Sequence, residues 1–391
     1  KMIMETGVLM MRIGFLLCVD FFPLFGYSYT VKRFKYRAKE KQMGMVSVAV
    51  DAMGGDNAPG EIVKGAVQAL KAKDDLKITL VGREEAIKGA LQGCDYPEDR
   101  LLILNATEVI EMAEPPVKAI STKKDSSIVK GLKLVKSGEC DAFVTAGSSG
   151  ATLVGGQVLL GRVKGIERPP FAPVLPSSKG PVLLIDCGAN VDARPSQLVQ
   201  FAQMGSIYME SIVGVKNPRV AMANIGAEEE KGNAVVKETM PLLEKTEGIN
   251  FTGSIEARDV VFGEADVVVC DAFTGNMILK TYEGTAAMLL GEIKTALKST
   301  LRSKIGALLI MPALKKTLKK FSISTYGGAP MLGLNGLVVK THGNAKAVEV
   351  EHSIEQCIEW KEKRINDQFI DKMHLVDRTK KDTTDTKKTE D

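Results

Sequence analysis

The sequence predicts an α/β fold, a doubly wound and mostly parallel sheet with helices on both faces. Three observations lead to this prediction. Eight short apolar runs lack the polar alternation of half-exposed strands, which is typical of parallel strands covered on both faces. Amphipathic stretches separate most of these runs. Six of the runs end in loops rich in Gly, Asn and Asp.

The expected strands lie at 46–50, 77–81, 101–104, 141–145, 182–186, 220–223, 266–270 and 337–340. The expected helices lie at 59–72, 126–136, 150–160, 195–213, 231–245, 274–299 and 344–366. We assign residues 43–368 to the α/β domain and residues 369–391 to a disordered, charged tail. Residues 1–42 lie outside the pattern, and we interpret them as an extension that does not belong to the native fold. A membrane anchor at 13–29 is the less favoured alternative, because Asp20 and Pro23 interrupt it.

Composition narrows the class of protein. Hydrophobic residues make up 45% of 391, enough for a large core. The six cysteines lack paired spacing, which indicates reduced thiols in a cytosolic protein, and the three histidines form no cluster with them, so no metal is expected. The net charge is +4, but residues 284–320 carry +7 and residues 32–41 carry +5, leaving −8 elsewhere. Such an acidic body with two basic segments favours a membrane surface or an acidic protein over nucleic acid as partner.

The six polar loops are the candidate site. In the first, a buried strand runs into Asp51 and then Gly54 and Gly55, before a helix opens after Pro59. Taken alone, this is equally well a tight turn that needs glycine. In open α/β sheets, however, ligands bind beyond the carboxyl ends of the strands, and helix N-termini there attract anions. Six such loops at one rim therefore predict an enzyme site.

Residues 284–321 break the alternation of strands and helices. Apolar residues recur every four positions from Leu289 to Ile305, and Pro312 is expected to start a second helix. We predict a pair of basic amphipathic helices that contact a membrane or a carrier protein, with 312–321 as the exposed tip. The alternative is that the leucines pack across a dimer interface. The expected contact residues are Lys294, Lys298, Arg302, Leu314, Lys315, Lys316, Leu318, Lys319 and Lys320.

From Met45 to Ile365 the chain resembles the bacterial acyl-carrier-protein:phosphate acyltransferases of phospholipid synthesis. The resemblance rests on the order and spacing of seven segments, which are 51–59, 161–169, 186–192, 231–233, 256–259, 273–276 and 326–329. Four positions depart from the family: Ser148 replaces an asparagine, Ser149 and Ala227 each replace a threonine, and Ala272 replaces a glycine. The loss of the amide at Ser148 puts any role of that amide in doubt.

The resemblance implies transfer of a long acyl group from acyl carrier protein to inorganic phosphate, giving the acyl phosphate that a downstream glycerol-3-phosphate acyltransferase consumes. It also implies a homodimer, attached peripherally to the inner face of the cell membrane. No cofactor is expected. The fold is expected to be similar to that of phosphate acetyltransferases and of the isocitrate and isopropylmalate dehydrogenases.

The reaction asks for positioning of an anion and for oxyanion donors, because phosphate is itself the nucleophile and the thiolate leaves readily. The residues expected to act in catalysis are Asp51, Asn57, Lys231, Asp271, Asn276, Lys280 and His342. The residues expected to bind phosphate are Gly54, Gly55, Asp56, Gly147, Ser148, Ser149, Gly150 and Gly275. The remaining loop residues of the site are Asp186, Gly188, Asn190, Asp192, Asn224, Gly226 and Glu228.

Within that set, the carboxylates are expected to orient lysines and hold loops rather than to transfer protons. His342 is a candidate proton donor to the leaving thiolate, or a loop-bonding residue. Cys187 and Cys270 are expected to be buried core thiols. Three other classes stay open: an acyl-coenzyme A-dependent phosphate acetyltransferase, an NAD-dependent decarboxylating dehydrogenase, and a non-catalytic membrane scaffold.

Overall fold

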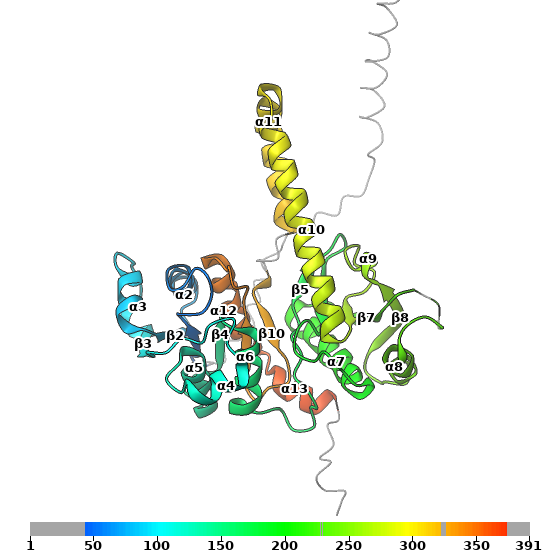
Figure 1. The fold of residues 1–391 in the computed structure, drawn as a ribbon, viewed down its shortest axis with the longest axis horizontal. Coiled ribbons are helices and arrows are strands. Elements are labelled where there is room, and N and C mark those ends of the chain that lie inside the picture. Colours follow the sequence, from blue (N-terminus) through cyan, green and yellow to red (C-terminus); the bar gives the residue numbers. More distant parts are fainter. Residues whose placement is uncertain (1–43, 227, 229, 322–325, 374–391) are drawn as a thin grey trace, which may run out of the picture. The chain divides into compact units, whose positions relative to one another are not determined.

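The computed structural model describes residues 44–226, 228, 230–321 and 326–373. The predictions for residues 1–42 and for 374–391 lie outside these residues. The described chain forms two sheets, one of six strands and one of five, with helices on the faces of both (Figure 1).

The first sheet has the strand order β10-β11-β4-β1-β2-β3, in which β10 is antiparallel to β11 and the other pairs are parallel. Its strands are β1 Val46–Asp51, β2 Leu76–Gly82, β3 Leu101–Asn105, β4 Ala142–Thr145, β10 Ala329–Met331 and β11 Leu337–Lys340. Alternate residues of β1 face opposite sides: Val48 joins a core cluster with helices α2 and α12, while Ala49 joins a cluster with α5. Both faces are therefore covered, which explains the uninterrupted apolar strands.

The helices that follow these strands are short. They are α2 Gly60–Ala72, α3 Glu84–Leu91, the 3₁₀ turn η1 Glu98–Arg100, α4 Pro116–Thr122, α5 Ser127–Ser137, α6 Ser149–Gly155, its π-helical continuation η2 Gly156–Leu160, and α12 Ala347–Glu362. Ser126 caps α5 and Gly138 ends it in the left-handed conformation, at φ 80°.

The second sheet has the order β5-β6-β9-β7-β8, with β5 antiparallel to β6. Its strands are β5 Val174–Pro176, β6 Pro181–Ile185, β7 Arg219–Asn224, β8 Asn250–Glu256 and β9 Val267–Val269. Its helices are α7 Pro195–Tyr208 with the π-helical η3 Met209–Val213, α8 Ala234–Glu244 and α9 Ala257–Val260. Leu183 and Ile185 pack toward Phe201 of α7, whereas Leu184 packs with the start of α10 on the opposite face.

The prediction of a single doubly wound sheet was wrong. Uninterrupted apolar strands indicate that both faces are covered, but pairing is made by backbone groups that every residue carries, so the pattern does not say which strands are neighbours. Three strands were also missed. Two of them, β5 and β10, have three residues each and include a proline, and β8 reads as polar because Gly253 and Ser254 interrupt it. The eight predicted strands are all present.

The predicted helix pair exists, but its turn lies elsewhere. Helix α10 spans Ala272–Lys298 and α11 spans Leu301–Lys320, so Pro312 lies inside α11 instead of starting it. In Figure 1 α10 leads away from the second sheet and α11 turns back along it. The Oγ1 of Thr300 accepts a hydrogen bond from the amide of Ser303 at 3.0 Å, which caps the new helix. The far end is therefore the turn at 299–300, and 312–321 is not the tip.

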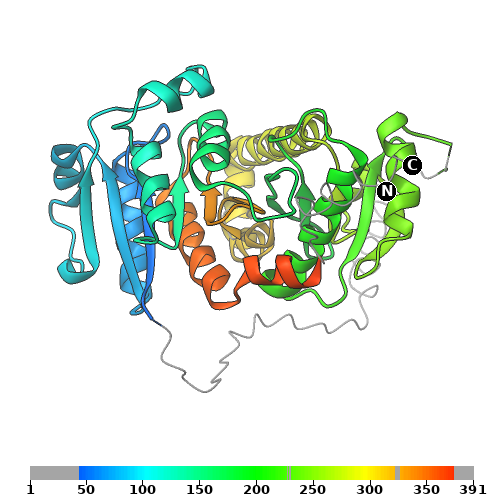
Figure 2. The same cartoon turned by 90° about the horizontal axis from the view of Figure 1, so that it is seen from below.

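Helices α12 and α13 (Ile365–Lys372) run between the two sheets, as Figure 2 shows in orange and red. Trp360 of α12 lies 6.3 Å, between ring centroids, from Tyr208 of α7 and 5.9 Å from Phe369 of α13, and it is 6% exposed. Phe369 is fully buried. The fold thus extends past residue 368 into the predicted tail, because α13 adds buried aromatic and apolar side chains to the core.

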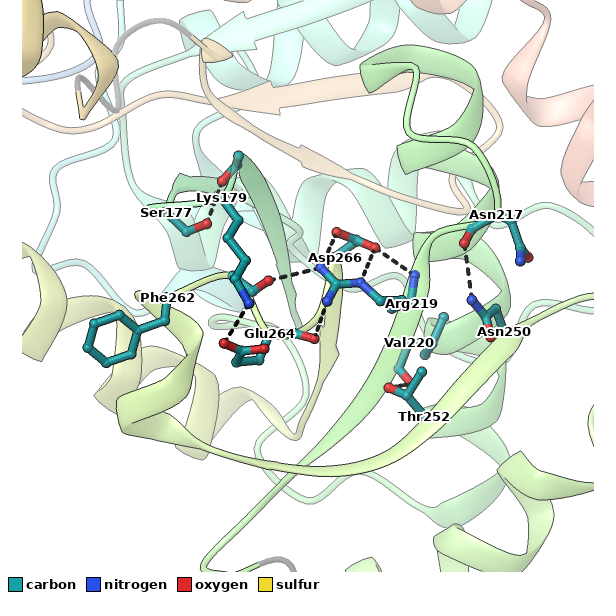
Figure 3. Close-up of polar contacts among 12 residues, drawn as sticks. Ser177, Lys179, Asn217, Arg219, Val220, Asn250, Thr252, Phe262, Glu264 and Asp266 are labelled. Atoms are coloured by element: carbon teal, nitrogen blue, oxygen red, sulfur yellow. Dashed lines mark hydrogen bonds and ion pairs between the residues drawn. The ribbon is translucent and has the colours of Figure 1, made fainter. Parts of the chain in front are cut away.

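An ion pair fixes the start of β7 to the loop before β9, at the amino-terminal ends of these two strands (Figure 3). The guanidinium of Arg219 donates to both carboxylate oxygens of Asp266, at 2.9 and 3.0 Å, and to the carbonyls of Gly263 and Glu264. Asp266 also accepts from the amide of Arg219 at 2.8 Å. The Arg219 side chain therefore joins the start of β7 to the whole of the 263–266 loop.

Replacing Arg219 with alanine should lower the free energy of unfolding by about 2 kcal/mol, because charged hydrogen bonds are lost and the Asp266 carboxylate loses the guanidinium with which it pairs. Urea unfolding measures this loss. The control is Lys179→Ala, which removes the neighbouring ion pair with Glu264, whose side chains are 55% and 51% exposed. It should cost less than about 0.5 kcal/mol. Equal losses in the two variants would contradict the assignment.

Candidate functional site

The loops at the carboxyl ends of β1, β4 and β11 are in direct contact. The amide of Asp56 donates to the carbonyl of Gly343 at 2.7 Å. A side chain at Gly54 would place its Cβ 2.6 Å from the amide nitrogen of Gly147, and one at Gly55 would lie 2.6 Å from the Gly343 oxygen. Close packing of the three loops therefore requires glycine at 54 and 55, and it brings both residues next to the 146–147 loop.

The close contacts change one expectation. The sequence predicted that amides around Gly54–Asn57 and Gly147–Gly150 are donors for an anion. The amide of Asp56 is occupied by Gly343, and that of Gly147 donates to the Oγ1 of Thr145 at 2.9 Å. These two groups do not point at a ligand. These two amides are therefore not free to bind an anion.

Asp51 is a buried carboxylate at the end of β1. It accepts hydrogen bonds from the Oγ1 of Thr145 at 2.7 Å and from the amide of Met53 at 3.1 Å. Burial raises the pKa of Asp51, while hydrogen bonds from Ser127 and Thr145 and the charge of Lys340 act in the opposite direction. Its contacts are those of a residue that holds the loops together.

Asn57 and the 146–150 loop also have local roles. The side-chain amide of Asn57 donates to the carbonyls of Asn344 and Ala345, at 2.9 and 3.2 Å, and so ties the first loop to the last.

Ser148 is buried and its Oγ accepts from the amide of Ala151, which caps α6, whereas Ser149 is exposed. A hydroxyl at 148 therefore caps the helix even though the family's amide is missing.

In the second sheet, Asp186 holds the loop that follows β6. Its carboxylate accepts hydrogen bonds from the amides of Phe171, Gly188, Ala189 and Asn190, at 2.8–3.2 Å, and from the Asn190 side chain at 2.7 Å. Burial raises the pKa of Asp186, and these hydrogen bonds oppose the shift. Gly188 and Asp192 of the same loop are exposed.

The loop after β6 packs on the start of α10. The carbonyl of Asn190 accepts from the amide of Ala272 at 2.9 Å. Asp271 caps α10, accepting from the amide and the hydroxyl of Thr274 at 2.8 and 2.9 Å. Gly275 is buried against the carbonyl of Asp186, and Asn276 is exposed. Asp186 and Asp271, which follow β6 and β9, thus each make hydrogen bonds that hold local structure.

The loop after β7 is separate from those contacts. Asn224 accepts from the amide of Ile225 at 2.8 Å, and the ion pair of Lys231 is with Glu228, at 3.6 Å, in the same loop. Gly226 packs against the Lys231 stem. Within the described residues, these contacts keep Lys231 in its own loop and do not bring it to the glycines of the first sheet.

One chain of contacts links the two sheets at the site. The Nε2 of His342, after β11, lies 2.7 Å from a carboxylate oxygen of Glu283 in α10, and the other oxygen accepts from Lys280 at 2.8 Å. Burial alone would raise the pKa of Glu283, but the hydrogen bonds from His342 and Lys280 hold it below its ordinary value. His342 and Lys280 are thus brought together, as expected of one site.

Sequence reasoning missed Glu283, Thr145 and Lys340. Glu283 lies three residues after Lys280 in a helix, a spacing that places both on one face. Thr145 and Lys340 are the last residues of apolar strands, where parallel strands present side chains to the site. Their position at strand ends was the feature that could have identified them.

The described cysteines are free thiols, and most of them are buried. Cys140, Cys187, Cys270 and Cys357 are buried and Cys94 is half-buried, all as free thiols. Burial raises the pKa of Cys187 and Cys270 well above the ordinary value. The expectation of buried core thiols at 187 and 270 is confirmed.

The expected contact residues of the helix pair are on the surface. Lys294, Lys298, Arg302, Lys315 and Lys316 are exposed, Leu318 is 37% exposed and Leu314 is half-buried; the side chains of Lys319 and Lys320 lie outside the described set. The apolar residues are exposed as well, Leu301 by 74% and Leu308 and Leu309 by 77% each. No helix among the described residues combines the length and apolar character needed to cross a membrane.

The sequence is similar to those of known proteins over most of its length. The family described as "Fatty acid synthesis protein" matches residues 46–368. A phosphate acyltransferase of Clostridium beijerinckii is 48% identical over 312 residues, which are 80% of this chain and 94% of that protein. One from Clostridium botulinum is 46% identical over 325 residues, 83% of this chain and 98% of that protein.

Solved structures agree at the level of the fold. A phosphotransacetylase from Streptococcus pyogenes superposes with a TM-score of 0.53 at 17% identity, and the EutD phosphotransacetylase from Staphylococcus aureus with 0.50 at 16%. Each comparison covers 81% of this chain and 94% of the other. At such low identity the likeness concerns the fold alone, and it supports the predicted α/β class.

Proposed function

The chain belongs to the phosphate acyltransferase family, and from this premise we propose that it transfers a long-chain acyl group from acyl carrier protein to inorganic phosphate. The product is an acyl phosphate, which serves the acylation of glycerol 3-phosphate in phospholipid synthesis. The observation that best supports the proposal is the contact between Lys280, Glu283 and His342, which brings a lysine of helix α10 to the loop that follows β11 of the first sheet. A phosphate bound there would lie between the positive charge of Lys280 and the closely packed loops of the first sheet.

Phosphate attacks the thioester carbon directly in this proposal. The oxygen–carbon bond forms, the carbon–sulfur bond breaks, and the proton of the hydrogen phosphate balances the thiol that leaves. The reaction needs no acyl-enzyme, because phosphate is itself the nucleophile. Cys187 and Cys270 are not expected to form one either, because burial raises the pKa of both thiols. In this proposal His342, which is 44% exposed and contacts Glu283, passes a proton to the leaving sulfur.

The test of this function incubates the full chain with phosphate and palmitoyl-acyl carrier protein, and measures acyl phosphate and free thiol. Separate reactions supply acetyl-coenzyme A with phosphate, or a hydroxy acid with NAD. We expect product only with the acyl carrier protein, and no acyl group on protein quenched during turnover. Faster reaction with acetyl-coenzyme A, or an acylated cysteine formed at the rate of turnover, would overturn the proposal.

Lys280 should contribute more to phosphate binding than Lys231 does. Lys280→Ala should raise the KM for phosphate by about tenfold, because a charged contact is worth at least about 1.4 kcal/mol, and should leave the KM for acyl carrier protein within about twofold. Lys231→Ala is the comparison, with an expected change below about threefold, because Lys231 pairs within its own loop. Steady-state kinetics with either substrate varied measures both. The reverse order would assign the phosphate site to the loop after β7.

We also propose that the helix pair attaches a homodimer to the inner face of the membrane, and that its basic residues serve acyl carrier protein. Apolar side chains are exposed along both helices, including Leu289 and Ile293 in α10 and Leu308 in α11. Basic residues lie beside them, and each one near an anionic lipid surface contributes about 1 kcal/mol. In this proposal the turn at 299–300 contacts the bilayer, and the sides of the two helices contact the second subunit of the dimer.

Introducing negative charges near that turn should greatly weaken membrane binding. Leu301 is 74% and Ile305 56% exposed, and the double change to aspartate should reduce sedimentation with phosphatidylglycerol vesicles at least about tenfold, because apolar contact is replaced by repulsion. Turnover of soluble acyl carrier protein and the dimer mass by light scattering should be unchanged. The matched control changes Leu314 and Leu318, at the other end of α11. If only the control loses binding, the membrane contacts 312–321 instead.

A further inference from the structure

Lys340 lies in the middle of the candidate site, but the proposed reaction assigns it no role. It ends β11, and in the sheet register it lies beside Thr145, the last residue of β4. Thr145 in turn donates to Asp51 at the end of β1. Asp51, Thr145 and Lys340 thus form a row across three neighbouring parallel strands, at the edge where α/β proteins bind ligands.

The ammonium of Lys340 is fixed by the backbone. It donates to the carbonyl of Ala146 at 3.3 Å and to that of Thr341. Among the described residues these are its hydrogen-bond acceptors, and an ammonium has three N–H groups. One N–H and most of the positive charge therefore remain for a ligand, on a side chain that is only partly exposed.

The charges around Lys340 come from both sheets. Asp51 and Asp56 attract its charge, and Lys280 of α10 repels it. Lys280 is itself paired with Glu283, which also binds His342. Two lysines from different sheets are thus close enough to oppose each other. A dianion between them would relieve that repulsion, since the amides of Asp56 and Gly147 are occupied by protein oxygens.

We propose that Lys340, at the end of β11 in the first sheet, binds the incoming phosphate directly. Lys280 of helix α10 would bind the same phosphate from the opposite side. This inference rests on the proposed function, because it names the residue that holds the nucleophile. The competing role is structural: Lys340 would only balance the buried charge of Asp51. The two roles differ in what they predict for phosphate, because a structural lysine leaves phosphate affinity unchanged in a folded variant.

The direct test measures binding of inorganic phosphate by calorimetry, without acyl donor, and the KM values for both substrates. Lys340→Met should weaken phosphate binding and raise its KM at least about tenfold, with the KM for acyl carrier protein within about twofold. The control Lys77→Met removes the same charge from β2 at the opposite end of the sheet, and should leave both values unchanged. A folded Lys340→Met variant with wild-type phosphate affinity would overturn the assignment.

A pH profile decides the question if Lys340→Met does not fold. Burial lowers the pKa of Lys340 to about 8, so phosphate affinity should fall as the pH rises through 8 and the ammonium loses its proton. Lys340→Arg keeps its charge and should hold its affinity to about pH 10. An unchanged alkaline fall in the arginine variant would contradict the proposal.

The outcomes separate this inference from the proposed function. If the wild-type protein binds phosphate through Lys340 but forms no acyl phosphate, the proposed reaction fails and the binding assignment stands. If acyl phosphate forms and the Lys340 variants keep the wild-type phosphate KM and pH profile, the assignment alone fails.

Discussion

Gly275→Ala should lower the free energy of unfolding by more than about 4 kcal/mol, or prevent folding. A Cβ at this position would lie 1.8 Å from the carbonyl oxygen of Asp186 and 2.9 Å from the Sγ of Cys270. The oxygen belongs to the backbone of a loop that Asp186 holds through five hydrogen bonds, so it has no easy way to move. Urea unfolding of the purified variant measures the loss.

The same helix offers a matched control. Gly284 also lies in α10 and is exposed, and a Cβ added there would meet no other atom within 4 Å. Gly284→Ala should raise the free energy of unfolding by about 0.5–1 kcal/mol, because alanine is the better helix former. If both alanine variants behave alike, close packing of α10 on the loop after β6 is not what requires Gly275.

Asp186→Ala should be the second severe change, with a loss of about 3–5 kcal/mol in the free energy of unfolding. Removing the carboxylate leaves several buried or half-buried amides without an acceptor, each costing roughly 1–3 kcal/mol where water does not replace it. The loop after β6 would then no longer support α10, so activity should fall with stability. Thermal and urea unfolding, with turnover measured on the folded fraction, test both effects.

Two further variants separate charge from loop position. Asp186→Asn keeps one acceptor oxygen but turns an amide toward the donors of Asn190, so it should recover only part of the loss. Asp192→Ala, in the same loop but exposed, should change the free energy by less than about 0.5 kcal/mol. An Asp192 variant as unstable as Asp186→Ala would refute the role of the hydrogen-bonded carboxylate.

The class of fold could be predicted because both faces of each sheet are covered. Residues such as Val48 and Ala49 face opposite clusters, so neither face needed polar residues and the strands read as continuous apolar runs. The number of sheets could not be predicted, since hydrogen bonds between strands involve no particular side chain. The turn of the helix pair was misplaced because Pro312 is tolerated within α11, and the capping role of Thr300 was overlooked.

The candidate site was predicted in part. Gly54, Gly55 and Gly147 come together because their loops follow strands of one parallel sheet, which sequence order does indicate. Lys231 was grouped with them because its loop has the same composition, but it follows a strand of the other sheet. Lys340 was missed because a single charged residue at the end of an apolar strand looks like a strand boundary. Its place beside Thr145 depends on strand order, which only the structure supplies.

The position of Trp360 gives the protein a built-in optical probe. It is the only tryptophan of the chain, so intrinsic emission excited at the indole band comes from a single place. That place is where α12, which packs on the first sheet, meets Tyr208 of α7, which packs on the second. Any rearrangement of one helix against the other alters the surroundings of this indole. Titration with phosphate or acyl carrier protein can therefore be followed by emission wavelength without attaching a dye.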